Sequence, residues 1–156
     1  MTQTITIAPV RKSIRVKTSQ ARAFEVFTAG LGQWWPKTHT IGAAPLKAVV
    51  METRLGGRWY ELAEDGTETT VGRIVAWEPP RRFVMSWDIN SGWKPDRTVG
   101  SEVEVRFIAD GPNATLVELE HRKFEAMGED AGASMRKDVD GGWPRMLEHF
   151  RQAAEA

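Results

Sequence analysis

Histidine is the side chain that most readily exchanges a proton near neutral pH, and this chain has three, at positions 39, 121 and 149. They are far apart and show no ligand spacing such as His-Glu-x-x-His, which argues against a metal site. The chain has no cysteine, so disulfides and thiolate metal ligands are excluded. The nucleophile motif Gly-x-Ser-x-Gly and glycine-rich phosphate loops are also missing from the sequence. We therefore expect no metal, no cofactor and no nucleophilic catalysis.

Glu61 and His121 are the polar side chains that the expected strand pairing turns toward an apolar interior. A histidine near a strand end most often bonds to the backbone, and the alternative is a proton donor or hydrogen-bond partner on a cavity wall. Glu61, if it faces inward, needs an arginine or histidine partner, because an isolated buried carboxylate is costly. Arg58 and Arg73 are the candidates if the register shifts by one residue. Structural and functional roles both stay open for Glu61 and His121.

Seven tryptophans and six methionines form an unusual apolar complement for a chain of this size. The segment VGRIVAWEPPRRFVMSWDI, residues 71–89, reads as two strands that place Phe83, Met85 and Trp87 on one face. Indole N–H groups need partners, and methionine adapts to irregular gaps. A solid core is the default interpretation of such a face. The alternative is an apolar cavity with a few polar groups, which is typical of small-molecule sites.

The elements that must position these residues follow from apolar periodicity. Ser19 is an N-cap signal for the first of two short helices, at 20–28 and 31–35. The C-terminal helix either starts near Gly142 or extends from about Ala133 and bends at Pro144, and we favour the bend because the apolar phase is unbroken. Hairpin connections predict one antiparallel sheet with the helices on one side, an α+β architecture. Strands are predicted at 5–16, 46–53, 57–63, 69–77, 83–89, 99–108 and 115–121.

Turn signals set the expected register of the central hairpins. Asp-Gly at 65–66 favours a two-residue loop, which places Trp59 opposite Gly72. Trp87 falls opposite the same glycine from the next strand, so Gly72 would leave room for two indoles.

The Pro-Pro pair at 79–80 is the second turn signal. A two-residue loop there pairs Ala76 with Phe83 and sends Val75 and Trp77 to the opposite face of the sheet. A slip of one residue would invert this assignment, because side chains alternate between the two faces.

The bulk numbers favour one soluble domain over residues 1–156. Basic and acidic residues balance at 21 each, so nothing favours nucleic acid or an anionic membrane surface. The longest apolar run, residues 48–51, is far too short to span a bilayer. The first residues show no apolar segment of a signal peptide. We expect a cytoplasmic protein with no nucleic-acid or membrane partner.

Several blocks of the chain, in order, resemble a known family. They are WWPKTHTIG (34–42), GGRWYE (56–61), VGRIVAWEPPRRFVMSW (71–87), EVEVRF (102–107), LVELEH (116–121) and GGWPRML (141–147). The chain resembles homologues of the activator of heat-shock-protein-90 ATPase, within the START-like, or SRPBCC, superfamily. The resemblance implies a helix-grip fold, in which a curved antiparallel sheet of about seven strands wraps around the long C-terminal helix. It also implies a cavity between sheet and helix.

The aromatic face and the resemblance together suggest a non-catalytic domain that binds an apolar or aromatic small molecule, which the sequence does not identify. Trp34-Trp35-Pro36 either packs the short helix onto the sheet, or Trp35 forms part of a cavity rim with His39. The expected ligand-binding residues are Trp35, Trp59, Glu61, Ile74, Met85, Trp87, Val105, Leu119, His121, Met135, Trp143 and Met146.

Two alternatives come from the same superfamily. One is a co-chaperone-like module, with a chaperone as partner and a link to the stress response. The other is a cyclase- or hydrolase-type enzyme that uses Glu61 or His121 as acid or base. A homodimer is a further expected partnership.

Overall fold

A seven-stranded antiparallel sheet forms the centre of the computed structural model, which describes residues 6–156. The strand order is β1-β7-β6-β5-β4-β3-β2, so neighbours in sequence from β2 to β7 are neighbours in the sheet and β1 pairs with β7. The single antiparallel sheet expected from the hairpin signals is confirmed. The strands are β1 Val10–Val16, β2 Leu46–Met51, β3 Arg58–Ala63, β4 Glu68–Glu78, β5 Arg82–Trp87, β6 Ser101–Ala109 and β7 Thr115–Arg122.

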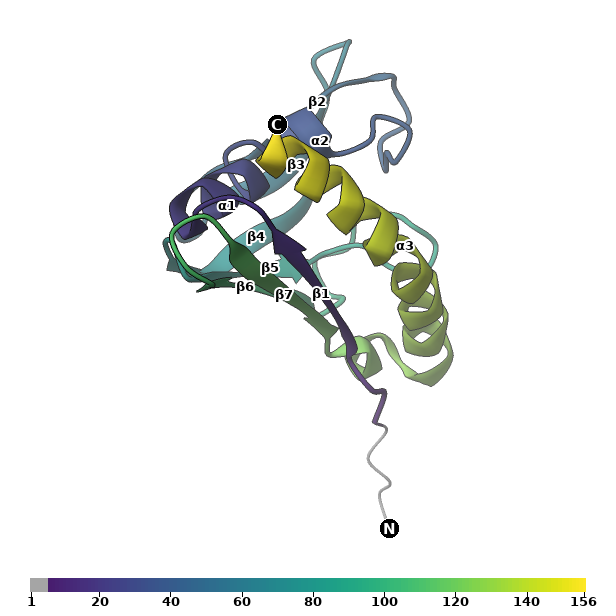
Figure 1. Cartoon of the computed structure of the whole chain (residues 1–156). Helices are drawn as coiled ribbons and strands as arrows, with labels where there is room; N and C mark the ends of the chain where they lie inside the picture. Colours follow the sequence, from purple (N-terminus) through teal and green to yellow (C-terminus); the bar gives the residue numbers. More distant parts are fainter. Residues whose placement is uncertain (1–5) are drawn as a thin grey trace.

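The helices lie on one side of this sheet. They are α1 Gln20–Phe27, α2 Leu31–Trp34, the 3₁₀ segment η1 Phe124–Met127 and the long α3 Glu129–Glu155. The α3 helix packs against β1, η1, α1 and α2, and Figure 1 shows it running across the curled sheet. The helix-grip α+β fold is confirmed. Within residues 6–156, no helix is long and apolar enough to cross a membrane.

Most element limits agree with the sequence patterns, with a few differences. Ser19 caps α1 as expected, since its side chain accepts a hydrogen bond from the Arg22 N–H. The predicted start of the first strand at Ile5 lies outside the described residues, and its extension over residues 6–9 is wrong, because β1 begins at Val10. Apolar spacing gave no indication of η1, and it placed the start of α3 four residues late, because Gly128 precedes the helix without a side-chain cap.

Helix α3 contains Pro144 in its interior. Proline has no N–H to donate to the carbonyl of Asp140, which favours a bend, and Figure 1 shows α3 changing direction part-way along its length. Met135 and Val139 before the proline and Met146 after it are all buried. The interpretation as one long, bent helix is therefore confirmed.

The β3–β4 hairpin has a longer loop than predicted. The Ala63 N–H donates to the Thr67 carbonyl at 2.8 Å, which leaves a three-residue loop closed by Gly66 at φ +89°. Such loops place the glycine in the left-handed region. A register shift between Trp59 and Tyr60 then restores the predicted Trp59–Gly72 pair. The predicted loop length is wrong and the predicted tryptophan pair is right.

The β4–β5 hairpin shows the same combination. Its loop spans residues 79–81, so Ala76 pairs with Val84 rather than with Phe83. A register shift between Ile74 and Ala76 absorbs the extra residue. As a result the pairing beyond the shift agrees with the two-residue-loop register.

This shift corrects the placement of Trp77. We predicted that Val75 and Trp77 share the outer face, and Val75 is indeed 48% exposed. The Trp77 ring, however, lies 5.0 Å from the ring of Phe24 in α1 and 6.3 Å from that of Phe83. The bulge changes the side-chain alternation between these two residues, which turns Trp77 toward the core.

Candidate functional site

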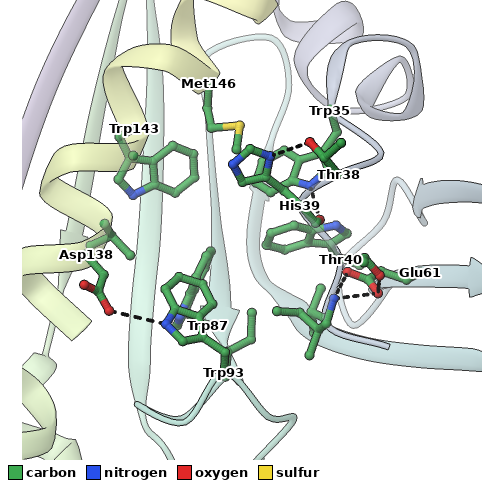
Figure 2. Close-up of a pocket in the computed structure, with 16 residues that line it drawn as sticks. Trp35, Thr38, His39, Thr40, Glu61, Trp87, Trp93, Asp138, Trp143 and Met146 are labelled. Carbon is green, nitrogen blue, oxygen red and sulfur yellow. Dashed lines mark hydrogen bonds between the residues drawn. The ribbon is translucent and has the colours of Figure 1, made fainter. Parts of the chain in front are cut away.

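A cavity of about 380 Å³ opens between α3, the sheet and the loop that joins α2 to β2. Its volume is within the range of small-molecule sites. Figure 2 shows the side chains that surround it. The lining residues are Trp35, Thr38, His39, Thr40 and Ile41 after α2, Trp59 and Glu61 of β3, Val71 of β4, Trp87 of β5, Ile89 and Trp93 of the β5–β6 loop, and Asp138, Val139, Gly142, Trp143 and Met146 of α3.

Four indole rings form a closed ring of neighbours on the cavity wall. Trp59 lies 5.1 Å from Trp35 and 5.7 Å from Trp87, measured between ring centroids. Trp143 closes the ring, at 6.1 Å from Trp87 and 6.3 Å from Trp35. The ring planes are tilted by 56° to 76°, as aromatic pairs prefer. Each indole comes from a different part of the chain, so this wall exists only in the folded protein.

Glu61 holds the loop that covers one side of the cavity. Its carboxylate accepts hydrogen bonds from the Thr40 hydroxyl at 2.8 Å, the Ile41 N–H at 2.8 Å and the Gly42 N–H at 2.9 Å. Figure 2 shows these bonds between Thr40 and Glu61. The expectation of an arginine or histidine partner is wrong, because backbone donors of the loop satisfy the buried carboxylate instead.

The same loop carries His39 over the cavity. The Nδ1 atom of His39 lies 3.3 Å from the Thr38 hydroxyl, and the His39 carbonyl accepts a bond from the Trp35 indole N–H at 3.2 Å. Trp34, in contrast, points into the core and donates to the Val26 carbonyl at 2.9 Å. The neighbouring tryptophans therefore divide the two expected roles: Trp34 packs α2, and Trp35 forms the rim together with His39.

Trp93 and Asp138 meet at another part of the rim. The Trp93 N–H donates to the Asp138 carboxylate at 3.3 Å, which connects the β5–β6 loop to α3 (Figure 2). Trp93 has φ 58°, an uncommon conformation for a bulky residue. The Asn90 side chain fixes this turn by accepting bonds from the N–H groups of Gly92 and Lys94, at 3.0 and 3.1 Å.

His121 lies behind the tryptophan wall and does not line the cavity. Its side chain is fully buried, and this burial lowers the pKa of His121 to about 3. Its Nδ1 accepts a hydrogen bond of 3.1 Å from the Trp143 N–H, which puts the proton of the neutral ring on Nε2. The expectation of a backbone partner is wrong. His121 fixes the orientation of Trp143 and stays neutral.

A family model described as Activator of Hsp90 ATPase homolog 1-like protein matches residues 17–155. The chain belongs to this family. The fold and the family model also place this AHSA1-like protein in the SRPBCC superfamily. Among curated proteins no match is found.

Two solved structures resemble this AHSA1-like protein over nearly its whole length. The anthrahydroquino-gamma-pyrone synthase Txn09, complexed with SUM, is 39% identical over 95% of this chain and 97% of its own, with a TM-score of 0.66. The self-sacrificing resistance protein CalC from Micromonospora echinospora is 34% identical over 94% of this chain and 93% of its own, with a TM-score of 0.68. An AHSA1-like protein from Aeromonas hydrophila, 17% identical over 93% of this chain and 92% of its own with a TM-score of 0.60, shares the fold.

The twelve residues expected to bind a ligand fall into two groups in this AHSA1-like protein. The structure brings six of them together on the cavity: Trp35, Trp59, Glu61, Trp87, Trp143 and Met146. The other six are buried in the core and do not line the cavity: Ile74, Met85, Val105, Leu119, His121 and Met135.

Sequence reasoning missed several lining residues. On α3, residues 138, 139, 142, 143 and 146 recur at helical spacing, so Asp138 and Gly142 could have been found from the positions of Trp143 and Met146. Val71 lines the cavity because of the β4 bulge. Ile89 follows Trp87 at strand spacing in the predicted strand 83–89, so it could have been added to the site. Thr38, Thr40, Ile41 and Trp93 lie outside the regular strands and helices, where periodicity gives no signal. Across residues 6–156, no group of three potential ligands is arranged to hold a metal ion.

Proposed function

We propose that this protein binds a planar aromatic small molecule in the cavity between α3 and the sheet. The closed ring of four indoles, from Trp35, Trp59, Trp87 and Trp143, is the observation that carries the proposal. Tilted indoles offer both ring faces and ring edges, and each contact with a ligand ring contributes beyond simple area burial. A cavity of about 380 Å³ accommodates a ligand of two or three fused rings.

The polar groups of the rim are suited to orienting such a ligand. His39 and Thr38 lie on one side of the opening and Asp138 on another. The indole N–H groups of Trp59 and Trp87 are buried and have no acceptor among residues 6–156. A few polar groups in an apolar cavity fix the orientation of a ligand, while the apolar walls provide most of the affinity.

The comparison with Txn09 supports an aromatic ligand. Txn09 is a synthase of an anthrahydroquino-gamma-pyrone, so its chemistry concerns a fused-ring aromatic compound, and it is 39% identical over 95% of this chain. Proteins of one fold often differ in function, so the support here comes from the wall of indoles together with this relative.

Gly142 provides the sharpest test of the proposal. It lines the cavity, and a Cβ built on it meets no heavy atom within 4 Å. Gly142→Leu therefore places a side chain in the ligand space. The neighbouring Gly141 also has open space around it but does not line the cavity, so Gly141→Leu is the matched control. Both changes replace a helical glycine and should raise helix stability by about 0.8 kcal/mol.

The measurement is tryptophan fluorescence and melting temperature, titrated with naphthoquinones, anthraquinones and related fused-ring compounds. We expect at least one compound to quench emission and raise the melting temperature of the wild type and of Gly141→Leu, and to have no effect on Gly142→Leu. Absence of any response in the wild type, or wild-type binding by Gly142→Leu, would overturn the proposal.

A second candidate function is catalysis on the same ligand, which the 39% identity to a synthase favours. Of the two acid–base residues suggested by the sequence, His121 is sealed behind the wall and Glu61 is occupied by the loop. His39 is then the rim residue for proton transfer. Conversion of an aromatic precursor by the wild type and its loss in His39→Ala, with ligand binding retained, would support this candidate.

A chaperone partner and a homodimer stay predictions of the sequence. The first predicts a complex with the heat-shock-protein-90 homologue and a faster ATPase, and a pull-down with purified chaperone tests it. The second predicts a doubled mass in sedimentation, which analytical ultracentrifugation measures directly.

A further inference from the structure

Apart from His39, the ionisable groups on the cavity wall are acidic. The sixteen lining residues include the carboxylates of Asp138 and Glu61 and contain no lysine or arginine. The Glu61 carboxylate is already surrounded by the loop donors Thr40, Ile41 and Gly42. The side chain of Asp138 is exposed at the rim, and within residues 6–156 its one hydrogen bond comes from Trp93 at 3.3 Å. Asp138 therefore keeps acceptor capacity toward the opening.

The cavity wall is rich in indole, the aromatic side chain that attracts cations most strongly. A cation is attracted to an aromatic face when it lies within about 6 Å of the ring centroid, and indole is the strongest of the aromatic side chains. Neighbouring centroids of Trp35, Trp59, Trp87 and Trp143 are 5.1 to 6.3 Å apart. A group bound in the cavity against this wall therefore lies beside more than one indole. Trp93, at 6.4 Å from Trp87, extends the aromatic surface toward Asp138.

Positive side chains of the neighbouring segments stay outside this site. Lys37, Lys94 and Lys137 are close in sequence to lining residues, but all three are exposed and none lines the cavity. An anionic ligand would thus meet carboxylates with no lysine or arginine on the wall, and an ammonium group would meet indoles and a carboxylate.

We propose that the cavity selects aromatic ligands that carry an ammonium group, with the cation against the indoles and oriented by Asp138. This inference rests on the proposed function, because it concerns the ligand class of the same cavity. It adds the requirement that the ligand carries a positive charge, which does not follow from the aromatic wall alone.

Three matched probes separate the inference from the proposed function. They are (2-naphthylmethyl)trimethylammonium, its neutral isostere 2-neopentylnaphthalene, and the anion 2-naphthylacetate, all titrated at one pH and two salt concentrations. The quaternary ammonium keeps its charge at every pH, so the first pair differs in charge and hardly in shape. We expect the cation to bind roughly tenfold more tightly than the neutral isostere, and the anion to bind most weakly.

Asp138→Asn tests the carboxylate, since asparagine keeps an oxygen acceptor for the Trp93 N–H and removes the charge. We expect it to weaken cation binding several-fold and to leave the neutral isostere unchanged. Asp130→Asn, an exposed aspartate of the same helix outside the cavity, is the control with the same loss of charge. Trp93→Leu, on the exposed loop, should likewise weaken the cation more than the neutral probe.

Each outcome decides one question. Equal affinity for the cation and the neutral isostere overturns the inference and leaves an aromatic-binding cavity. Tighter binding of the anion also overturns it. Binding of none of the three probes, together with no response to fused-ring compounds, overturns both the inference and the proposed function.

Discussion

Replacing Glu61 tests whether one carboxylate holds the loop over the cavity. Glu61 is 5% exposed, and its Oε1 and Oε2 atoms accept bonds from the Thr40 hydroxyl and from the N–H groups of Ile41 and Gly42. Glu61→Gln preserves the size of the side chain but replaces one acceptor oxygen with an NH₂ group. That group faces loop donors, so at least one bond is lost and the remaining ones lose their charge.

The magnitude follows from the number and type of these bonds. A hydrogen bond to a charged group contributes about 1.5–3 kcal/mol. The loop donors are less buried than Glu61, so water replaces part of the loss when the loop detaches. We therefore expect a local cost of about 1–2 kcal/mol for Glu61→Gln, concentrated in the loop rather than in the sheet. The affinity for any ligand enclosed by the loop should fall with it.

Native-state hydrogen exchange, followed by NMR, measures this effect at the two amides concerned. We expect the amides of Ile41 and Gly42 to exchange about tenfold faster in Glu61→Gln, since 1.4 kcal/mol corresponds to a factor of ten. Urea denaturation should show a smaller change for the whole protein. Glu64→Gln, an exposed glutamate after the same strand, is the control and should change neither quantity.

One result would refute this reasoning. If the Ile41 and Gly42 amides exchange at wild-type rates in Glu61→Gln while the global stability falls, the loop is held by packing of the Ile41 side chain and Glu61 serves the strand alone.

Two further predictions concern the wall behind the cavity and the β4 bulge. Burial lowers the pKa of His121 from 6.5 to about 3, so between these pH values the unfolded chain binds a proton that the native state does not. Stability should therefore fall as the pH drops from 6.5 toward 3, by up to about 1.4 kcal/mol per pH unit from this group, and urea denaturation at pH 7 and pH 5 should show a smaller difference in His121→Phe. Trp77→Ala should lower the free energy of unfolding by about 2 kcal/mol, because its ring packs on Phe24 and Phe83. Val75→Thr, on the exposed side of the bulge, should change the urea denaturation midpoint little. Equal effects of the two substitutions would place Trp77 on the outer face.

The hairpins show how far the sequence determines the register. Asp-Gly and Pro-Pro correctly mark both turns, and a two-residue loop is the simplest interpretation of each. In the structure each loop has three residues, and a bulge in β4 absorbs the extra one. Pairs beyond the bulges, such as Trp59–Gly72, are therefore predicted correctly, and residues between bulge and turn, such as Trp77, are not. The Trp77 ring contacts Phe24 of α1, which is distant in sequence, and local patterns do not contain such a contact.

The cavity residues on strands and helices could be predicted from the sequence, and those on loops could not. Trp59, Trp87 and Trp143 were found because they belong to strands and a helix. In these elements the repeat of two or 3.6 residues determines which face of the element a side chain occupies. Ile41 and Trp93 were missed because their position depends on backbone N–H groups that donate to the side chains of Glu61 and Asn90. Nothing in the spacing of the loop residues specifies those bonds before the sheet has formed.

The two halves of the cavity are stabilised in different ways, and this difference bears on how function can vary within the family. The indole wall is part of the core: Trp143 is bound to the sealed His121 and packs among other buried rings, so a change there costs stability as well as binding. The rim is held by a few polar bonds, those of Glu61 to the loop and of Trp93 to Asp138, so its residues can change at little cost to the fold. Txn09 and CalC are 39% and 34% identical to this chain, yet one is described as a synthase and the other as a resistance protein. For the ligand binding proposed above, we therefore expect substitutions at the rim residues His39, Trp93 and Asp138 to change ligand preference at less cost to stability than substitutions in the indole wall.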